Sequence, residues 1–112
     1  MRESDWTRKV CRDMEQHGAV VLALVAGKRQ SPGWPDRYVC HPAFHGWLEF
    51  KGENTRLRPL QRAVMERLNL RRPRTALVVR APGRVEDHEG RLLDEFDGTG
   101  GSLLAALRRV TS

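Results

Sequence analysis

The stretch "GWPDRYVCHPAFHGWLEFKGENTRLRPLQ", residues 33–61, decides how this chain is expected to fold. Its parts "DRYVCH" and "GWLEFK" predict two short strands, joined as a hairpin by "PAFH". Because alternate side chains of a strand share a face, Glu49 and Lys51 are expected to project from one face while Leu48 and Phe50 point into the core. A packed core does not need a carboxylate and a lysine inside a strand, so this pair indicates a candidate functional site.

The sequence around this hairpin predicts alternating helices and strands. Apolar residues recur at helical spacing in two segments, and short valine-rich runs are typical of buried strands. The predicted elements are a helix at 3–17, a strand at 19–26, strands at 36–41 and 46–51, a helix at 57–70 and a strand at 74–81. The order α-β-β-β-α-β predicts an α/β fold in which helices flank a mixed sheet.

We expect one domain, residues 1–112, with a core at about 1–81 and a C-terminal appendage at 82–112. The acidic segment 84–97 predicts a solvated hairpin or edge strand. "GTGGS" predicts a flexible joint, and Ser102 is the expected N-cap of a short closing helix.

Composition restricts the class of protein. Hydrophobic residues make up 39% and charged residues 30%, which is typical of a folded globular chain. The longest apolar run, 19–26, is too short to cross a bilayer, and the N-terminus lacks a signal-peptide pattern. An intracellular, cytoplasmic protein is therefore expected, with free thiols at Cys11 and Cys40, no membrane partner and no organic cofactor.

The distribution of charge predicts contact with nucleic acid. The chain has 20 Lys and Arg against 14 Asp and Glu, a net charge of +6. Residues 51–74 hold eight bases and two acids, so this segment alone accounts for the excess. A local excess of arginine attracts polyanions and suits phosphate oxygens. The alternative is a basic helix face that serves only solubility.

Two carboxylates in the stretch fit a divalent metal. If the two predicted strands pair, Asp36 reaches the face that carries Glu49, and such a hard-oxygen site suits Mg²⁺ or Mn²⁺. Lys51 could then hold a water or a phosphate, and Gln61 could orient that lysine or water. The alternative is a solvent-facing Glu-x-Lys pair on an edge strand. A zinc site at Cys40, His41 and His45 lacks a fourth ligand at suitable spacing.

"GWPDR" followed by "LEFKGENTRLRPLQ" resembles the virus-type replication-repair nuclease (VRR-NUC) family of the PD-(D/E)XK nuclease superfamily. The resemblance covers about residues 1–80 and is most specific at 33–61. It implies a restriction-endonuclease-like core and a metal-dependent endonuclease. Its implied metal ligands are Asp36, Glu49 and the Phe50 carbonyl, with Lys51 as the catalytic lysine and Gln61 as its helper.

The resemblance also implies a substrate and an assembly. Small stand-alone members of phages and bacteria act as homodimers on branched DNA, with four-way junctions as the leading substrate. Flaps, forks or plain duplex are the alternative substrates, and a DNA-binding module without catalysis is the alternative function. The residues expected to contact DNA are Lys28, Arg29, Arg37, Arg56, Arg58 and Arg62.

The chain departs from the family pattern at two places. Relatives often carry a glutamate, which completes the metal site, where this chain has Thr7. Glu3, one turn earlier on the same helix face, is the expected substitute, with Asp5 and Glu15 as alternatives. Trp34 stands where a small aliphatic residue is usual, and we expect it to pack beneath the metal loop or to stack on an unpaired base.

Overall fold

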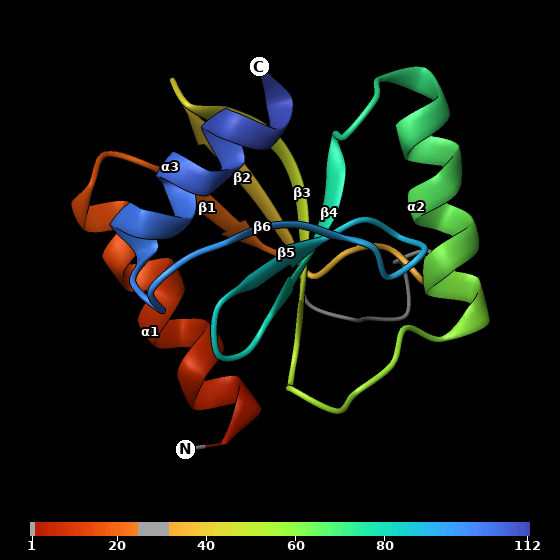
Figure 1. Ribbon diagram of the computed structural model, residues 1–112, viewed down its shortest axis with the longest axis horizontal. Coiled ribbons are helices and arrows are strands. Elements are labelled where there is room, and N and C mark those ends of the chain that lie inside the picture. The colour runs from red at the N-terminus through yellow and green to blue at the C-terminus, as the bar shows by residue number, and fades with distance from the viewer. Residues whose placement is uncertain (1, 25–31) are drawn as a thin grey trace.

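Three helices and six strands make up the described part of the protein, residues 2–24 and 32–112 of a computed structural model (Figure 1). In chain order they are α1 (Glu3–Gln16), β1 (Val20–Ala23), β2 (Arg37–His41), β3 (Phe44–Lys51), α2 (Pro59–Arg71), β4 (Ala76–Arg80), β5 (Arg84–Glu86), β6 (Leu92–Glu95) and α3 (Gly100–Thr111). The predicted α-β-β-β-α-β order is confirmed. None of the described helices is long and apolar enough to span a bilayer.

The strands form one mixed sheet in the order β1-β2-β3-β4-β5-β6. Strands β3 and β4 are parallel, and the other neighbours are antiparallel. A parallel pair needs a long crossover, and α2 supplies it. The helix begins at Pro59 because proline is suited to the first helical position, where its missing N–H leaves no hydrogen bond unmade.

The helices cover both faces of the sheet. Helices α1 and α3 lie together on one face, and α2 lies on the other (Figure 1). Alternation along β3 follows this division: Leu48 and Phe50 belong to the core shared with α1 and α3, whereas Trp47 packs against the α2 side, where Met65 is fully buried. The inward direction predicted for Leu48 and Phe50 is therefore confirmed.

Residues 82–112 are an integral part of the fold, so the prediction of an appendage is wrong. Strands β5 and β6 extend the same sheet, and Leu103 and Leu107 of α3 are fully buried in the main core. The acidic segment does form a hairpin, but Glu86 within it is only 4% exposed. The packing of α3 on α1 involves distant residues, and local sequence patterns do not reveal such contacts.

The glycines at the start of α3 are helical and do not form a flexible joint. Thr99 is the N-cap in place of Ser102, and its hydroxyl accepts a hydrogen bond from the Ser102 N–H at 3.2 Å. A Cβ at Gly100 would collide with the backbone of Met14, so glycine allows α1 and α3 to approach closely. Gly100 also donates its N–H to the Asp13 carboxylate.

Candidate active site at the ends of strands β2 and β3

Asp36 and Glu49 meet where β2 begins and β3 ends. Antiparallel pairing sets Arg37 opposite Leu48, which brings the preceding aspartate beside the following glutamate. The Asp36 N–H donates to Glu49 Oε1 at 3.1 Å, and the Phe50 N–H donates to Asp36 Oδ1 at 3.4 Å. The two carboxyl groups predicted to converge are therefore neighbours.

Glu49 and Lys51 are buried beneath the start of α2. They are only 5% and 6% exposed, and Lys51 Nζ lies 3.5 Å from Glu49 Oε2. Strand β3 lies between β2 and β4, so the alternative of a solvent-facing pair on an edge strand is wrong. A buried charge is tolerated only when it is paired or hydrogen-bonded, and each of these two groups supplies a partner for the other.

Gln61 joins the site from the first turn of α2. Its Oε1 accepts from the Arg58 N–H at 2.9 Å, which satisfies one of the free donors at the helix start. Its Nε2 donates to Glu49 Oε2 at 3.2 Å. The amide thus fixes the glutamate in place, whereas the sequence predicted that it would orient the lysine or a water.

Burial raises the pKa of both acids. The pKa of Asp36 rises from 3.8 to about 7, first because of burial and then because of the nearby Glu49 charge. Arg37, the Phe50 N–H and Lys51 act in the opposite direction. Burial likewise raises the pKa of Glu49. Two close carboxyl groups that resist ionisation are a site where a cation binds favourably, since its charge offsets theirs.

The first helix reaches this site through Glu3. An open cleft of about 560 Å³ separates the start of α1 from β2 and β3, and Glu3, Thr7 and Asp36 are among its lining residues. The Glu3 charge is close enough to raise the pKa of Glu49. Glu3 Oε2 also accepts from the Thr55 hydroxyl at 3.4 Å. Of the predicted first-helix acids, Glu3 is the one at the cleft.

The two alternative acids predicted for this role, Asp5 and Glu15, lie elsewhere on α1. Asp5 pairs with Arg2 at 3.3 Å and with Arg8 at 2.7 Å. Glu15 is twelve residues beyond Glu3, which is roughly 18 Å along a helix. Sequence reasoning missed Arg2 and Arg8, which also line the cleft; their position on the helix expected to supply the third acid was the available signal.

The backbone carbonyl of Phe50 points toward the side of β3 where Asp36 lies. Within a strand, the N–H and C=O of one residue point the same way, and this N–H faces Asp36. The next carbonyl, that of Lys51, faces the opposite side and accepts from the Ala81 N–H at 2.9 Å. Two carboxylates and a carbonyl are hard oxygen donors, so the residues present fit Mg²⁺ or Mn²⁺.

A complete metal cage is not preformed. Across residues 2–24 and 32–112, no three His, Cys, Asp or Glu side chains converge closely enough to hold an ion. Cys40 contacts His45 at 3.5 Å, while His41 Nε2 lies 3.0 Å from the His17 carbonyl. Magnesium usually keeps several waters and takes only one or two carboxylates, so the Asp36–Glu49 pair meets its needs.

The predicted DNA contacts divide into three groups. Lys28 and Arg29 lie outside the described residues. Arg37 is only 18% exposed and donates to the Asp36 carbonyl at 2.9 Å, so it supports the site from within. The exposed group on and before α2 comprises Arg56, Arg58 and Arg62.

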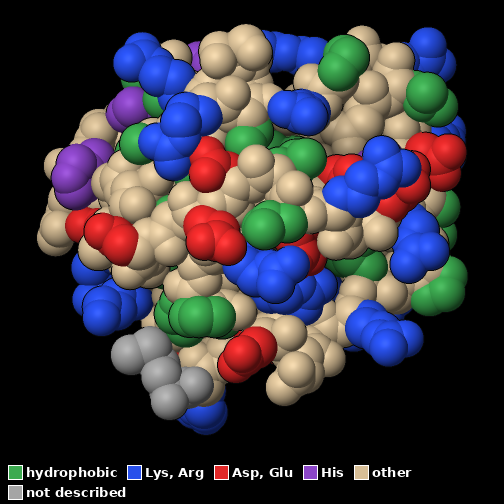
Figure 2. All heavy atoms as spheres, in the orientation of Figure 1, with side chains coloured by type: hydrophobic (Ala, Val, Ile, Leu, Met, Phe, Trp, Pro, Cys, Tyr) green, Lys and Arg blue, Asp and Glu red, His purple; other side chains and the backbone are tan. Residues whose placement is uncertain are grey.

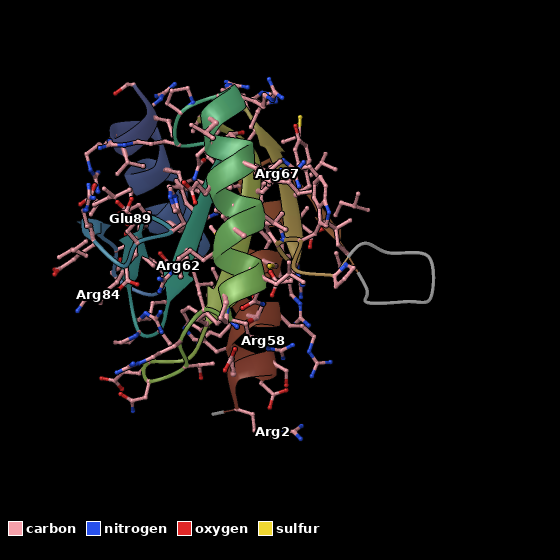
Figure 3. All side chains as sticks on the ribbon, turned by 90° about the vertical axis from the view of Figure 1, so that its right-hand side faces the viewer. Arg2, Arg58, Arg62, Arg67, Arg84 and Glu89 are labelled. Carbon is pink, nitrogen blue, oxygen red and sulfur yellow. The ribbon has the colours of Figure 1, made fainter. Side chains whose placement is uncertain are left out.

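Helix α2 carries Arg62, Arg67 and Arg71 against a single acid, Glu66. Figure 2 shows Lys and Arg side chains along the side that α2 occupies, with acidic groups between them. In Figure 3, Arg58 at the start of α2 and Arg2 at the start of α1 lie at the same end of the molecule. The start of α1 lines the cleft, and its positive dipole end favours an anion there.

Trp34 packs against another aromatic ring. Its ring lies edge-on to Trp47 at 5.1 Å between centroids, and Tyr38 contacts Trp47 at 4.8 Å. Trp34 therefore makes an aromatic contact within the protein, while 38% of the residue stays exposed.

Comparison with protein-family models, curated proteins and solved structures gave no match to this chain. The function is therefore inferred from the geometry of the site.

Proposed function

We propose that this protein is a metal-dependent endodeoxyribonuclease with a PD-(D/E)XK-type core, acting as a homodimer on branched DNA and foremost on four-way junctions. The observation that carries the proposal is the convergence of Asp36, Glu49, Lys51 and Gln61 at the sheet end where basic helix α2 begins. A two-fold junction needs two symmetric cuts, and a C2 dimer supplies two equivalent sites.

Mg²⁺ or Mn²⁺ would be held by Asp36, Glu49 and the Phe50 carbonyl, with Glu3 across the cleft. When bound, the ion lowers the pKa of a water and neutralises charge on the phosphate. Lys51, fixed 3.5 Å from Glu49, adds a positive charge beside the scissile phosphate. Water adds to phosphorus as a P–O bond to one sugar oxygen breaks, leaving a phosphate on one strand end and a hydroxyl on the other.

The protein residues supply positioning. Gln61 and the Asp36 N–H hold opposite oxygens of Glu49, so its carboxylate cannot rotate freely. Arg56 and Arg58, in the connection to α2, would contact the phosphates that flank the cut. Cleavage by such a site depends on fixed geometry as much as on charge.

The direct test is cleavage by the purified protein of a four-way junction with Mg²⁺ or Mn²⁺, and with chelator as a blank. Glu49→Gln should abolish nicking, and Lys51→Ala should lower it by about 10²–10³-fold. Junction binding should survive in both variants. Glu53→Gln, an exposed acid in the same connection, is the matched control and should cut normally. Cutting at the wild-type rate by Glu49→Gln would refute the assignment.

One observation favours a second candidate, a DNA-binding module without catalysis. No third acidic side chain converges with Asp36 and Glu49 among the described residues. Calorimetric titration with Mn²⁺ separates the two functions, since only the nuclease should show heat that Glu49→Gln removes. Flap, fork and duplex substrates compared at one salt concentration would identify the preferred DNA, because phosphate-driven binding can imitate preference.

A further inference from the structure

Strands β4 and β5 carry a buried ion pair that the proposed chemistry does not use. Arg80 Nε lies 2.9 Å from Glu86 Oε1, and their side chains are 15% and 6% exposed. The parallel register sets Arg80 beside Lys51, so both side chains share the α2 face of the sheet. The pair therefore lies next to the candidate active site without lining the metal cleft.

Arg80 also donates hydrogen bonds to the connection between β3 and α2, residues 52–58. Its Nη1 donates to the Gly52 carbonyl at 2.8 Å and to the Thr55 carbonyl at 2.5 Å. One planar guanidinium thus joins a buried carboxylate to two points of the loop backbone. The more exposed Arg84 also lies beside this carboxylate, with its Nε 3.1 Å from Glu86 Oε2.

Residues of the candidate site lie at both ends of this connection. It begins directly after Lys51, carries Arg56 and Arg58, and leads into the turn that presents Gln61. The other described hydrogen bonds of Thr55 are longer, 3.3 Å to the Gly52 carbonyl and 3.4 Å to Glu3. Arg80 is therefore the strongest tether of the loop among the described contacts.

We propose that Arg80 is a positioning residue for DNA cleavage, held by Glu86 and holding the Lys51–Gln61 connection in its reactive geometry. The inference rests on the proposed function. A buried ion pair adds little net stability compared with apolar residues of similar size, so its contribution is to geometry. Displacement of reacting groups by about 1 Å can slow an enzyme about 10²-fold.

The test compares two arginines that pair with the same carboxylate. Arg80→Met should lower kcat on a four-way junction about 10²-fold and change KM less than about threefold, because the three described acceptors of its guanidinium all belong to the protein. Arg84→Met is the matched control. Arg84 is 47% exposed and projects outward from the hairpin, away from the start of α2 (Figure 3), so its loss should leave kcat unchanged. Arg80→Lys should be intermediate, since an ammonium keeps the charge but cannot span the three acceptors.

The double variant Arg80→Met/Glu86→Leu guards against misfolding, because it removes both buried charges together. It should unfold at a temperature close to that of the wild type and still cut slowly. A folded double variant with wild-type kcat, or equal kcat for Arg80→Met and Arg84→Met, would overturn the positioning role.

Failure of the proposed function itself gives a different result, namely no metal-dependent cutting by the wild type. The tether is then judged by amide hydrogen exchange across residues 52–58. Exchange there should be faster in the double variant and unchanged in Arg84→Met. Equal exchange in the double variant and the wild type would refute the tether whatever the activity.

Discussion

Replacing Asp36 by asparagine in the metal-free protein tests the electrostatics of the candidate site. Burial and the neighbouring Glu49 raise the pKa of Asp36 from 3.8 to about 7. Asparagine keeps a side-chain oxygen that can accept from the Phe50 N–H, now at 3.4 Å from Asp36 Oδ1. The substitution therefore removes the charge and leaves the shape almost unchanged.

Proton linkage gives the direction in which folding stability changes with pH. The folded protein keeps the Asp36 proton up to about pH 7, whereas the unfolded chain releases it near pH 3.8. The stability that this raised pKa contributes is complete below pH 3.8 and is lost as the pH rises through 7. The difference corresponds to roughly 4 kcal/mol, and solvent screening reduces it to about 1–2 kcal/mol because the side chain is 33% exposed.

We expect Asp36→Asn to be more stable than the wild type by about 1–2 kcal/mol at pH 8 in chelator, a rise in Tm of roughly 4–8 °C, and nearly equal to it at pH 4. Thermal unfolding at pH 4, 6 and 8 measures this. Asp94→Asn is the control, because Arg109 lowers the pKa of Asp94 and its loss should bring no gain at pH 8. A gain of equal size at pH 4 and pH 8, or a loss at pH 8, would refute the reasoning.

Bound metal should reduce or reverse the stability advantage of Asp36→Asn over the wild type at pH 8. Excess Mn²⁺ at pH 8 should raise the Tm of the wild type, because a ligand that binds only the folded state stabilises it. The same addition should have little effect on Asp36→Asn, which lacks one of the two carboxylates.

Two further predictions concern the DNA surface and the core. Arg62→Ala should weaken junction binding and lower the slope of log K against log salt by about 1, measured by fluorescence anisotropy at several salt concentrations; an unchanged slope would mean that this arginine does not contact phosphate. Gly100→Ala should destabilise the protein by about 1–3 kcal/mol in urea unfolding, because a Cβ there collides with the backbone of Met14; wild-type stability would mean that α1 and α3 are free to separate.

The sequence by itself determined the central hairpin and the direction of its side chains. Strand alternation is a local property, so the spacing of Glu49 and Lys51 was enough to set them on one face and Phe50 in the core. The element order through β4 followed from periodicity, an equally local signal, whereas α2 begins at Pro59, two residues after the predicted start at 57.

Only the tertiary structure decided which distant groups meet. Glu3 lies at the cleft while Asp5 pairs with neighbouring arginines, although both occupy the first turn of α1. The contacts of Arg80 with Gly52 and Thr55 and the packing of α3 into the main core depend on how strands and helices associate. Burial and hydrogen bonding between residues far apart in the chain set these arrangements, and no local pattern encodes them.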